Sequence, residues 1–356
     1  MDPASLIPFP DTIPAPWGFF EILLILTFFA HLVFMNAMLG TALIGLVREM
    51  RAAPADPPPC RDIASTLPYT IAFAVNFGVA PLLFLQVLYG HFIYTSSILM
   101  GAYWLSIIGL LILAYYSAYL YKMGADLPQA ARKRALATSI LLLLVIAFFF
   151  VNNMTLMQTP QNWSAYFNRP DGTLLNLAEP TLLARYLHFM VASVATGGLF
   201  LAILASFQQK NGTPGAAQRL SGGMQWFTYA TVVEIGTGIP FLFSMPKNVH
   251  QLFVGASPLH TILFASSLVA AFFCLYYGNK ERVWPATFAM GATILFMVLV
   301  RDLARQAYLA EYFHPADLRV VPQWSPMLLF LAILVIGVAI VIYMLRLAAR
   351  VPGEVR

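Results

Sequence analysis

The strongest constraint on this chain is a series of apolar runs, each long enough to cross a lipid bilayer. A membrane-spanning helix needs about 20 mainly apolar residues, and the sequence holds about nine such runs. A backbone inside a bilayer must satisfy its own hydrogen bonds, which favours helices for runs of this length. We therefore predict an all-α, polytopic transmembrane helix bundle with spans at 17–47, 67–97, 101–121, 135–155, 181–208, 223–244, 258–278, 285–309 and 323–346.

Composition supports a membrane protein and excludes several other classes. Of the 356 residues, 60% are hydrophobic and 10% are charged, whereas soluble domains carry about 25% charged residues. The two cysteines, Cys60 and Cys274, provide no disulfide framework, and no CxxCH motif for a covalent c-type heme occurs. The proline-rich residues 1–16 contain no Lys or Arg, so no cleavable signal peptide is expected.

The Lys and Arg residues of the loops predict the orientation of the bundle. Cytoplasmic loops carry an excess of these residues, and here they concentrate after odd-numbered spans and in the C-terminal tail. The N-terminus is therefore expected outside and the C-terminus in the cytoplasm of a bacterial cell, with the bundle in the inner membrane. We predict an outer segment 1–16, a transmembrane bundle 17–347 and a cytoplasmic tail 348–356. The net charge of +5 reflects the loops and indicates no nucleic-acid partner.

All six histidines fall in the predicted outer half of the bundle. An ionisable side chain inside the bilayer is costly and usually marks a functional site, and histidine is a common axial ligand of heme iron. The in-span positions are His31, His91, His188 and His260, and the loop positions are His250 and His314. Outer loops commonly hold polar residues, which accounts for the last two but not for His31 and His188. A hydrogen bond to a neighbouring helix is the alternative role for an in-span histidine.

The span that contains His188 is also rich in small residues. They follow the histidine directly and comprise Ala192, Ser193, Ala195, Thr196, Gly197 and Gly198. Small residues leave room either for a closely packed neighbouring helix or for a flat cofactor. Both interpretations are open from the sequence.

Charged residues inside two later spans are further candidates for a functional site. Glu234 lies mid-span, and the glycines and Pro240 that follow it predict a kinked or locally unwound helix. Its carboxylate is suited to proton transfer or to binding a quinol hydroxyl, with a structural hydrogen bond as the alternative. Arg301, Asp302 and Arg305 lie near the outer end of the eighth span. They are expected either to bind heme propionates through the arginines or to form a simple ion cluster.

Four ordered segments carry a family resemblance. They are residues 30–42 around His31, residues 75–78 leading to Tyr89 and Gly90, the turn 157–160, and the His188 helix. With nine spans and an outer N-terminus, they resemble subunit I of the cytochrome bd quinol oxidases. The resemblance covers residues 17–210 well and the C-terminal third loosely. It implies a helix bundle that binds heme through His31 and His188.

The sequence also departs from that family. The outer loop after the sixth span, which the family uses for quinol, is reduced to residues 247–258. The third span has no acid in 105–116, where the family's oxygen reductases carry two glutamates. Residues 265–268 stand where the family places a methionine ligand, and the eighth span lacks an obvious glutamate ligand. The resemblance therefore supports b-type heme, and it does not support a heme d oxygen-reducing centre.

A low-spin b heme needs two axial ligands, so His188 needs a partner from another helix. His260 is preferred over His91, because its span resembles the family's second-ligand helix. It stands about two turns nearer the surface than the matching position, which also suits a ligand of a different heme. Gln158, in the turn after the fourth span, joins Glu234 as a candidate for quinone or proton binding.

These observations predict a membrane-embedded b-type cytochrome with two or more hemes. The heme iron is the only metal expected, and only the axial heme ligands bind it. It would be the quinol-oxidising or quinone-reducing subunit of a respiratory or photosynthetic complex. Its expected partners are lipid, quinone, and an outer c-type cytochrome or a second membrane subunit. Two alternatives stay open. One is a divergent bd-type oxygen reductase, and the other is a heme-free transporter or assembly subunit, although no inverted repeat supports a transporter.

Overall fold

The computed structural model describes residues 2–52, 61–124, 127–168 and 170–350. Within these ranges the chain is a bundle of α-helices, with short 3-10 or π segments (η1–η4) in its outer connections. The α-helices are α1 (Trp17–Arg51), α2 (Arg61–Leu99), α3 (Gly101–Met123), α4 (Gln129–Gln158), α5 (Pro180–Lys210), α6 (Ala216–Ser244), α7 (Lys247–Gln251), α8 (Pro258–Asn279), α9 (Val283–Leu309) and α10 (Trp324–Arg350). The η segments are η1 (Pro3–Leu6), η2 (Pro160–Asn168), η3 (Leu252–Ala256) and η4 (Pro315–Asp317).

The long helices coincide with the predicted spans. Among the described residues, eight helices are long and apolar enough to cross a membrane. The remaining long helix, α6, has 29 residues and is less apolar, because Glu234, threonines and glycines interrupt its apolar run. The predicted all-α, multi-span fold is confirmed. Most of the predicted tail, 351–356, and Cys60 lie outside the described residues.

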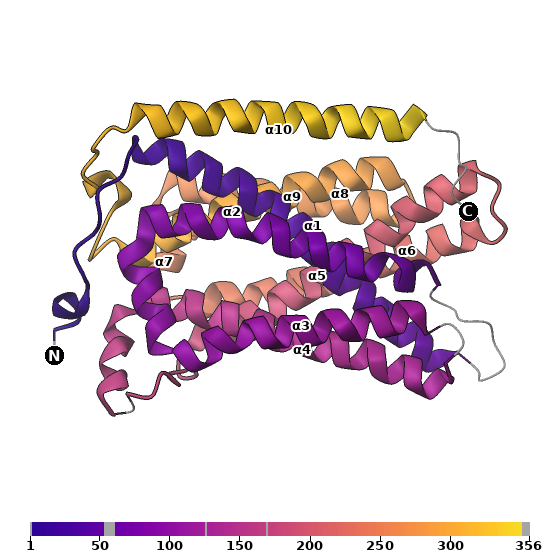
Figure 1. Ribbon diagram of the computed structural model, residues 1–356, viewed down its shortest axis with the longest axis horizontal. Coiled ribbons are helices and arrows are strands. Elements are labelled where there is room, and N and C mark those ends of the chain that lie inside the picture. The colour runs from indigo at the N-terminus through magenta and orange to yellow at the C-terminus, as the bar shows by residue number, and fades with distance from the viewer. Residues whose placement is uncertain (1, 53–60, 125–126, 169, 351–356) are drawn as a thin grey trace.

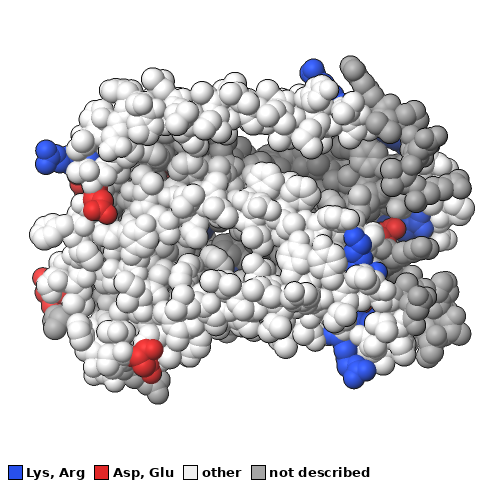
Figure 2. Space-filling model, in the orientation of Figure 1, with Lys and Arg blue, Asp and Glu red and all other residues white. Residues whose placement is uncertain are grey.

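The long helices run along one axis and place their loops at two ends (Figure 1). Helices α1 and α5 lie in the middle, since α1 packs against α2, α4, α5 and α9, and α5 packs against α1, α4, α6 and α9. Helix α10 lies along one side of the bundle, with largely exposed apolar side chains. Figure 2 shows Lys and Arg mainly at the end predicted to be cytoplasmic, and Asp and Glu mainly at the other end. The orientation in the membrane stays a prediction.

The small residues of α5 serve helix packing. A Cβ on Gly40 of α1 would overlap the Ser193 carbonyl oxygen, and a Cβ on Gly197 would overlap the backbone of Gly40. On the other side, a Cβ on Gly198 would lie 2.9 Å from the Gly223 carbonyl oxygen of α6. Helices α1 and α6 therefore fill the space beside these residues. Of the two roles that the sequence left open, room for a neighbouring helix or for a flat cofactor, these glycines serve the first.

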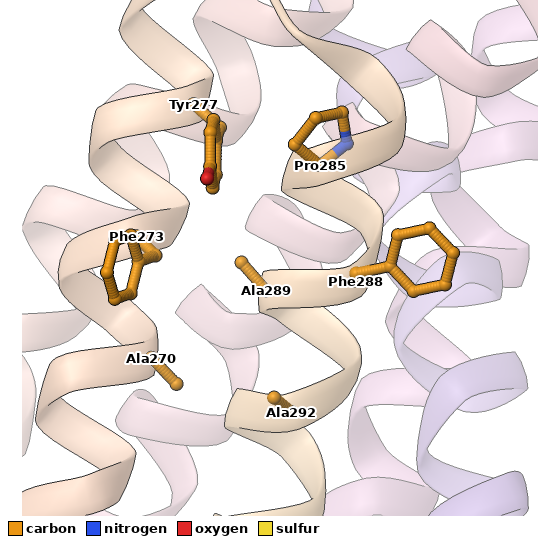
Figure 3. Close-up of a pocket in the computed structure, with 7 residues that line it drawn as sticks. All are labelled: Ala270, Phe273, Tyr277, Pro285, Phe288, Ala289 and Ala292. Atoms are coloured by element: carbon orange, nitrogen blue, oxygen red, sulfur yellow. The ribbon is translucent and has the colours of Figure 1, made fainter.

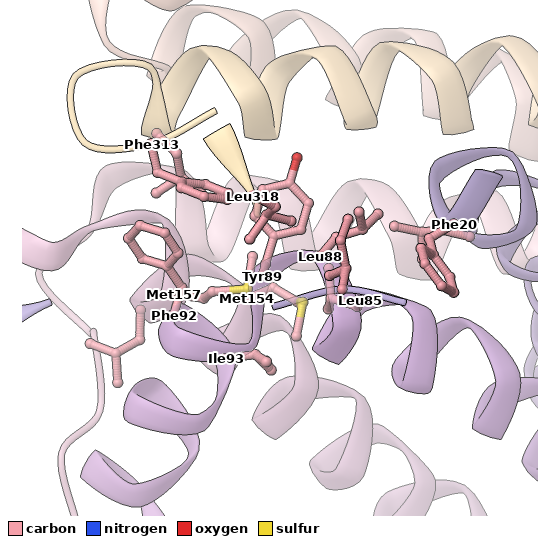
Figure 4. Packing of buried hydrophobic residues seen from close by; sticks show 14 of the residues in the cluster. Phe20, Leu85, Leu88, Tyr89, Phe92, Ile93, Met154, Met157, Phe313 and Leu318 are labelled. Atoms are coloured by element: carbon pink, nitrogen blue, oxygen red, sulfur yellow. The ribbon is translucent and has the colours of Figure 1, made fainter. Parts of the chain in front are cut away.

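The end of the bundle that is predicted to face outward, called the outer end below, is closed by an apolar cluster and by the N-terminal segment. Tyr89, Phe92 and Phe313 belong to this cluster (Figure 4). The Ile13 N–H donates to the Arg319 carbonyl at 3.0 Å and the Ile13 carbonyl accepts from the Val321 N–H at 2.9 Å, so the segment before α1 pairs with the segment before α10. Helix α2 has a break at Tyr89, where φ is −130° and ψ is 31°.

Helix α6, by contrast, continues without a break through Pro240 to Ser244. The predicted local unwinding near Glu234 is therefore wrong. A proline removes one backbone hydrogen bond, and a membrane helix tolerates this when neighbouring groups compensate for the loss. Of the two glycines in this segment, Gly238 faces the His188 ring, whereas nothing lies within 4 Å of a Cβ position at Gly236.

Candidate functional site: two histidines and a buried arginine cluster

His31 projects from α1 towards α2. Its Nδ1 lies 3.0 Å from the Ala74 carbonyl oxygen. Because a carbonyl oxygen only accepts, Nδ1 must carry the proton, which leaves the lone pair on Nε2. Gly78, one turn along α2, faces the same ring, and a Cβ there would lie 3.0 Å from Cε1 and from Nδ1. The glycine thus gives the imidazole the room that it needs.

His188 projects from α5 towards α6 and repeats this arrangement. Its Nδ1 lies 3.3 Å from the Thr237 Oγ1, and that hydroxyl donates its own proton to the Glu234 carbonyl at 3.0 Å. The hydroxyl can therefore only accept from His188, so Nδ1 again carries the proton and Nε2 the lone pair. Gly238 faces this ring, with its Cβ position 3.4 Å from Cε1.

Both histidines are thus in the tautomer that a metal-binding imidazole uses. Such imidazoles bind through one nitrogen and donate the other N–H to an oxygen, which fixes the ring orientation. The two rings are held by different helix pairs, α1 with α2 and α5 with α6. The arrangement therefore suits two separate ligation sites.

Three arginines lie in the outer half of the bundle near these rings. On α9, the Arg301 guanidinium lies 4.3 Å from the centre of the Phe28 ring, and Phe28 lies beside His31. Asp302 forms its ion pair with Arg305 and not with Arg301. Positions three apart share a helix face, whereas adjacent positions do not. The predicted cluster therefore leaves Arg301 without a carboxylate partner from its own helix.

Sequence reasoning did not assign a role to the third arginine, Arg185. It lies one turn before His188 on α5, is 6% exposed, and donates from Nη1 to the Gln158 Oε1 at 2.9 Å. The i, i+3 spacing of Arg185 and His188 places both on one helix face, and this spacing is a signal that the sequence did contain. Gln158 is likewise buried, so its amide oxygen is held by Arg185 rather than open at the outer surface.

Several buried donors of this region lack a partner among the described residues. They include the Arg185 Nε, the Arg305 Nε and the Tyr89 hydroxyl. An unsatisfied buried donor is costly and calls for an explanation. The carboxylates of a heme would supply acceptors for arginine nitrogens. Together with two histidines whose Nε2 is available, these donors fit a b-type heme.

The other histidines occupy different surroundings. His260 contacts Ser257 at the start of α8, with 2.8 Å from Nδ1 to Oγ, and the Phe253 ring. His91 is buried among Phe92 and Phe313 in the outer apolar cluster. Neither set of contacts includes His188, so ligation of one heme by His188 with either residue stays a prediction.

The two loop histidines give no comparable arrangement. The His314 Nδ1 accepts from the Ala316 N–H at 3.1 Å, which places its proton on Nε2 in the neutral ring. The His250 Nδ1 lies 3.4 Å from the Met245 carbonyl oxygen, in the short connection after α6. His314, whose Nδ1 is an acceptor, therefore serves as the control position for substitutions of the in-span histidines.

Glu234 lies on α6 one turn before Thr237, and is half-buried. In the described part of the chain no side chain hydrogen-bonds its carboxylate, although its backbone carbonyl accepts from the Thr237 hydroxyl. The carboxylate is therefore available to a ligand or a proton, close to the His188 site.

An open apolar groove of about 310 Å³ lies between α8 and α9. Figure 3 shows its aromatic lining, Phe273, Tyr277 and Phe288, with Ala289 and Ala292 between them. The groove is lined by no histidine, and neither Glu234 nor Asp302 contributes to it. Within the described residues, no three His, Cys, Asp or Glu side chains gather as they would around a bare metal ion.

Comparison with solved structures identifies the architecture. A chain of the bd oxidase from Geobacillus thermodenitrificans superimposes with a TM-score of 0.68 over 99% of both chains, at 14% sequence identity. The chain has a bd oxidase fold. No protein-family model matches the sequence, and no curated protein matches it. The predicted structural resemblance to a bd oxidase subunit is thus confirmed at the level of the fold, in a strongly divergent chain.

Proposed function

We propose that the chain is the membrane-embedded, heme b-binding subunit of a quinol or quinone oxidoreductase. The observation that carries this proposal is the pair of in-span histidines, His31 and His188, each with Nδ1–H committed to an oxygen of the neighbouring helix. Each Nε2 is then free to bind iron, and two or more b hemes are expected in the outer half of the bundle. When bound, these hemes supply one-electron carriers at that depth.

The protein's own residues would handle protons and substrate position. Oxidation of one quinol releases two electrons and two protons, so the site needs a proton acceptor within hydrogen-bond reach of a quinol hydroxyl. Glu234 fits this role, since its carboxylate has no side-chain partner and Thr237 connects its helix turn to His188. Gln158 is the second candidate for a quinone contact, although Arg185 holds its amide oxygen.

The electron partner is proposed to lie at the outer end. The in-span histidines lie nearer that end of their helices, and the chain has no covalent c-type heme motif of its own. We expect either an outer c-type cytochrome or a second membrane subunit. A pull-down in mild detergent that recovers the chain alone would count against both.

Optical spectroscopy of the purified full chain tests the proposal. A dithionite-reduced spectrum with pyridine hemochrome quantification should show b bands and about two hemes per chain. Additional d bands would instead favour a bd-type oxygen reductase. A spectrum without heme bands would favour a transporter or an assembly subunit.

Oxygen reduction is not part of the proposed function. Helix α3 carries no carboxylate in residues 105–116, and the resembled oxygen reductases use acids there for proton delivery. Membranes that contain the chain should show no cyanide-resistant oxygen uptake with a reduced quinol analogue. Robust uptake that depends on this chain would require the oxygen-reductase alternative.

A further inference from the structure

The groove between α8 and α9 has the chemistry of a binding site for a hydrocarbon chain. The small side chains of Ala270, Ala289 and Ala292 leave the space between the two helices open (Figure 3). Phe273 and Tyr277 of α8 line it as one aromatic wall, with their stacked ring centres 6.0 Å apart. The groove therefore offers about 310 Å³ of apolar space to a molecule of the surrounding bilayer.

The groove extends along one half of the bilayer. Ala270 lies nine residues before the end of α8 at Asn279, and Ala292 lies nine residues after the start of α9 at Val283. At a rise of about 1.5 Å per residue, the groove reaches roughly 14 Å along the helices from these ends. One leaflet contributes about 15 Å of hydrocarbon to a bilayer. The groove thus matches the depth of one leaflet, at the end of the bundle where Lys and Arg gather (Figure 2).

Two cations lie in the turn between α8 and α9, next to the end of the groove that Tyr277 lines. Lys280 follows α8 directly, and Arg282 precedes α9 and donates its backbone N–H to the Tyr277 carbonyl at 3.0 Å. The acid between them, Glu281, accepts a hydrogen bond from the Ser221 hydroxyl of α6. Within the described chain neither Lys280 nor Arg282 forms an ion pair, so both charges are available to an anion.

Aromatic side chains accompany these cations, as is typical of a membrane–water interface. The Lys280 Nζ donates to the Tyr276 hydroxyl at 2.8 Å and lies 4.5 Å from the centre of that ring. A neutral hydroxyl does not compensate the ammonium charge, and the other ammonium protons stay available. Trp284, at the start of α9, is exposed. Because tyrosine and tryptophan are enriched at the level of the lipid headgroups, this turn is expected to lie among the phosphates.

We propose that the groove between α8 and α9 is a specific binding site for one anionic phospholipid of the adjacent leaflet. One acyl chain lies in the groove, and the headgroup phosphate binds Lys280 and Arg282. A phospholipid fits both parts, because it joins a chain of leaflet length to an anion at the interface. An isoprenoid quinone also has an apolar chain, but its uncharged headgroup does not match the two cations.

The test is native mass spectrometry of the purified full chain, titrated with phosphatidylglycerol or with phosphatidylcholine that carries the same acyl chains. The wild type should retain one phosphatidylglycerol at least about tenfold more strongly than phosphatidylcholine, since each basic residue near the membrane surface favours anionic lipid. The double variant Lys280→Gln with Arg282→Gln should lose this preference. Lys133→Gln with Arg134→Gln is the matched control and should keep it, because it removes the same charge from the start of α4.

A second pair of variants tests the groove itself. Ala289→Trp places an indole ring between the helices and should release the retained lipid. Val269→Trp adds the same ring at an exposed position of α8 that does not line the groove, and it should retain the lipid.

Three outcomes would overturn the proposal. Equal retention of the two lipids by the wild type, or equal losses in the variants and their controls, would leave only a general attraction of anionic lipid to basic loops. Retention by Ala289→Trp would mean that the headgroup binds without the groove. Displacement of phosphatidylglycerol by an equimolar isoprenoid quinone would assign the groove to a quinone chain instead.

Discussion

The arginines inside the two ends of the bundle differ in whether they have a carboxylate partner. At the predicted cytoplasmic end, Arg132 of α4 pairs with Glu49 of α1 at 3.4 Å, and the Tyr121 hydroxyl donates to the same carboxylate at 3.0 Å. At the outer end, half-buried Arg301 lies over the Phe28 ring, and the adjacent Asp302 pairs with Arg305. Arg132 thus has a carboxylate partner, whereas Arg301 has no ion pair among the described residues.

This difference separates a structural site from a ligand site. The Arg132–Glu49 pair has its counter-charge and a tyrosine hydrogen bond, and it connects three helices at the inner end. A cation inside the bundle without an anion is costly to maintain, so Arg301 is the position where binding of an anionic group would be favourable. The histidines with available Nε2 atoms lie at the same end.

The largest expected effect concerns the iron ligands. His31→Ala and His188→Ala should each abolish one heme per chain, because an alanine offers no lone pair to the iron. The measurement is pyridine hemochrome content per protein. His314→Ala is the control and should retain full heme, since its Nδ1 already accepts a backbone N–H. Full heme content in both in-span variants would remove the basis for an outer ligand site.

The next effect concerns the free energy of unfolding, and it compares substitutions of Arg132 and Arg301. Arg132→Met should lower the free energy of unfolding by about 3 kcal/mol, because it leaves Glu49 as an unpaired buried charge. Arg301→Met in the heme-free chain should lower it much less, since Arg301 has no ion pair among the described residues and loses only a cation–π contact with Phe28. Unfolding in detergent, followed by circular dichroism, gives both values. Equal destabilisation by the two substitutions would break the distinction between the ends.

A smaller, kinetic effect is expected at Glu234. Glu234→Gln keeps the side-chain shape and removes the proton acceptor, so quinol-driven heme reduction should slow by at least about tenfold with unchanged heme content. Stopped-flow absorbance at the b band measures the rate. Glu281→Gln is the control, because Glu281 accepts from Ser221 at the inner end. Normal kinetics in Glu234→Gln would move the quinol site away from Glu234, towards buried Gln158 or towards His250 in the connection after α6.

The smallest effect should appear at Thr237, which accepts the His188 Nδ1–H. Thr237→Val removes a hydrogen bond worth about 1 kcal/mol. An imidazole without this acceptor donates less to ferric iron, so the electron equilibrium should shift about fivefold towards the reduced form. Thr237→Ser keeps the hydroxyl and should behave as wild type in a redox titration. A lowered potential in Thr237→Val would contradict the assigned donor and acceptor.

Much of the fold was predictable because membrane insertion depends on local composition. Apolar runs such as 135–155 and 285–309 became helices α4 and α9, close to their predicted bounds. The placement of His31 and His188 inside spans followed from the apolar runs 17–47 and 181–208. The glycines and Pro240 after Glu234 were a poorer guide to local structure, since they predicted unwinding and α6 remains helical through Pro240.

The candidate site was only partly predictable because its contacts join distant parts of the chain. Asp302 could pair with Arg301 or Arg305, and helix geometry together with packing decided for Arg305. Gln158 was expected at an exposed turn, yet Arg185 holds it inside the bundle. Arg185 itself was visible one turn before His188, but its hydrogen bond with Gln158 depends on how α4 and α5 pack.

The sequence by itself predicted the long helices and the apolar runs that they contain, because the length and composition of each run are local properties of the chain. Only the tertiary structure decided which nitrogen of each histidine is free, since Ala74 and Thr237 belong to neighbouring helices. It also decided that the glycines of α5 contact α1 and α6, and that Arg301 lies over the Phe28 ring while Asp302 pairs with Arg305. A hydrogen bond or a charge contact depends on direction and distance between helices, and these are set by packing.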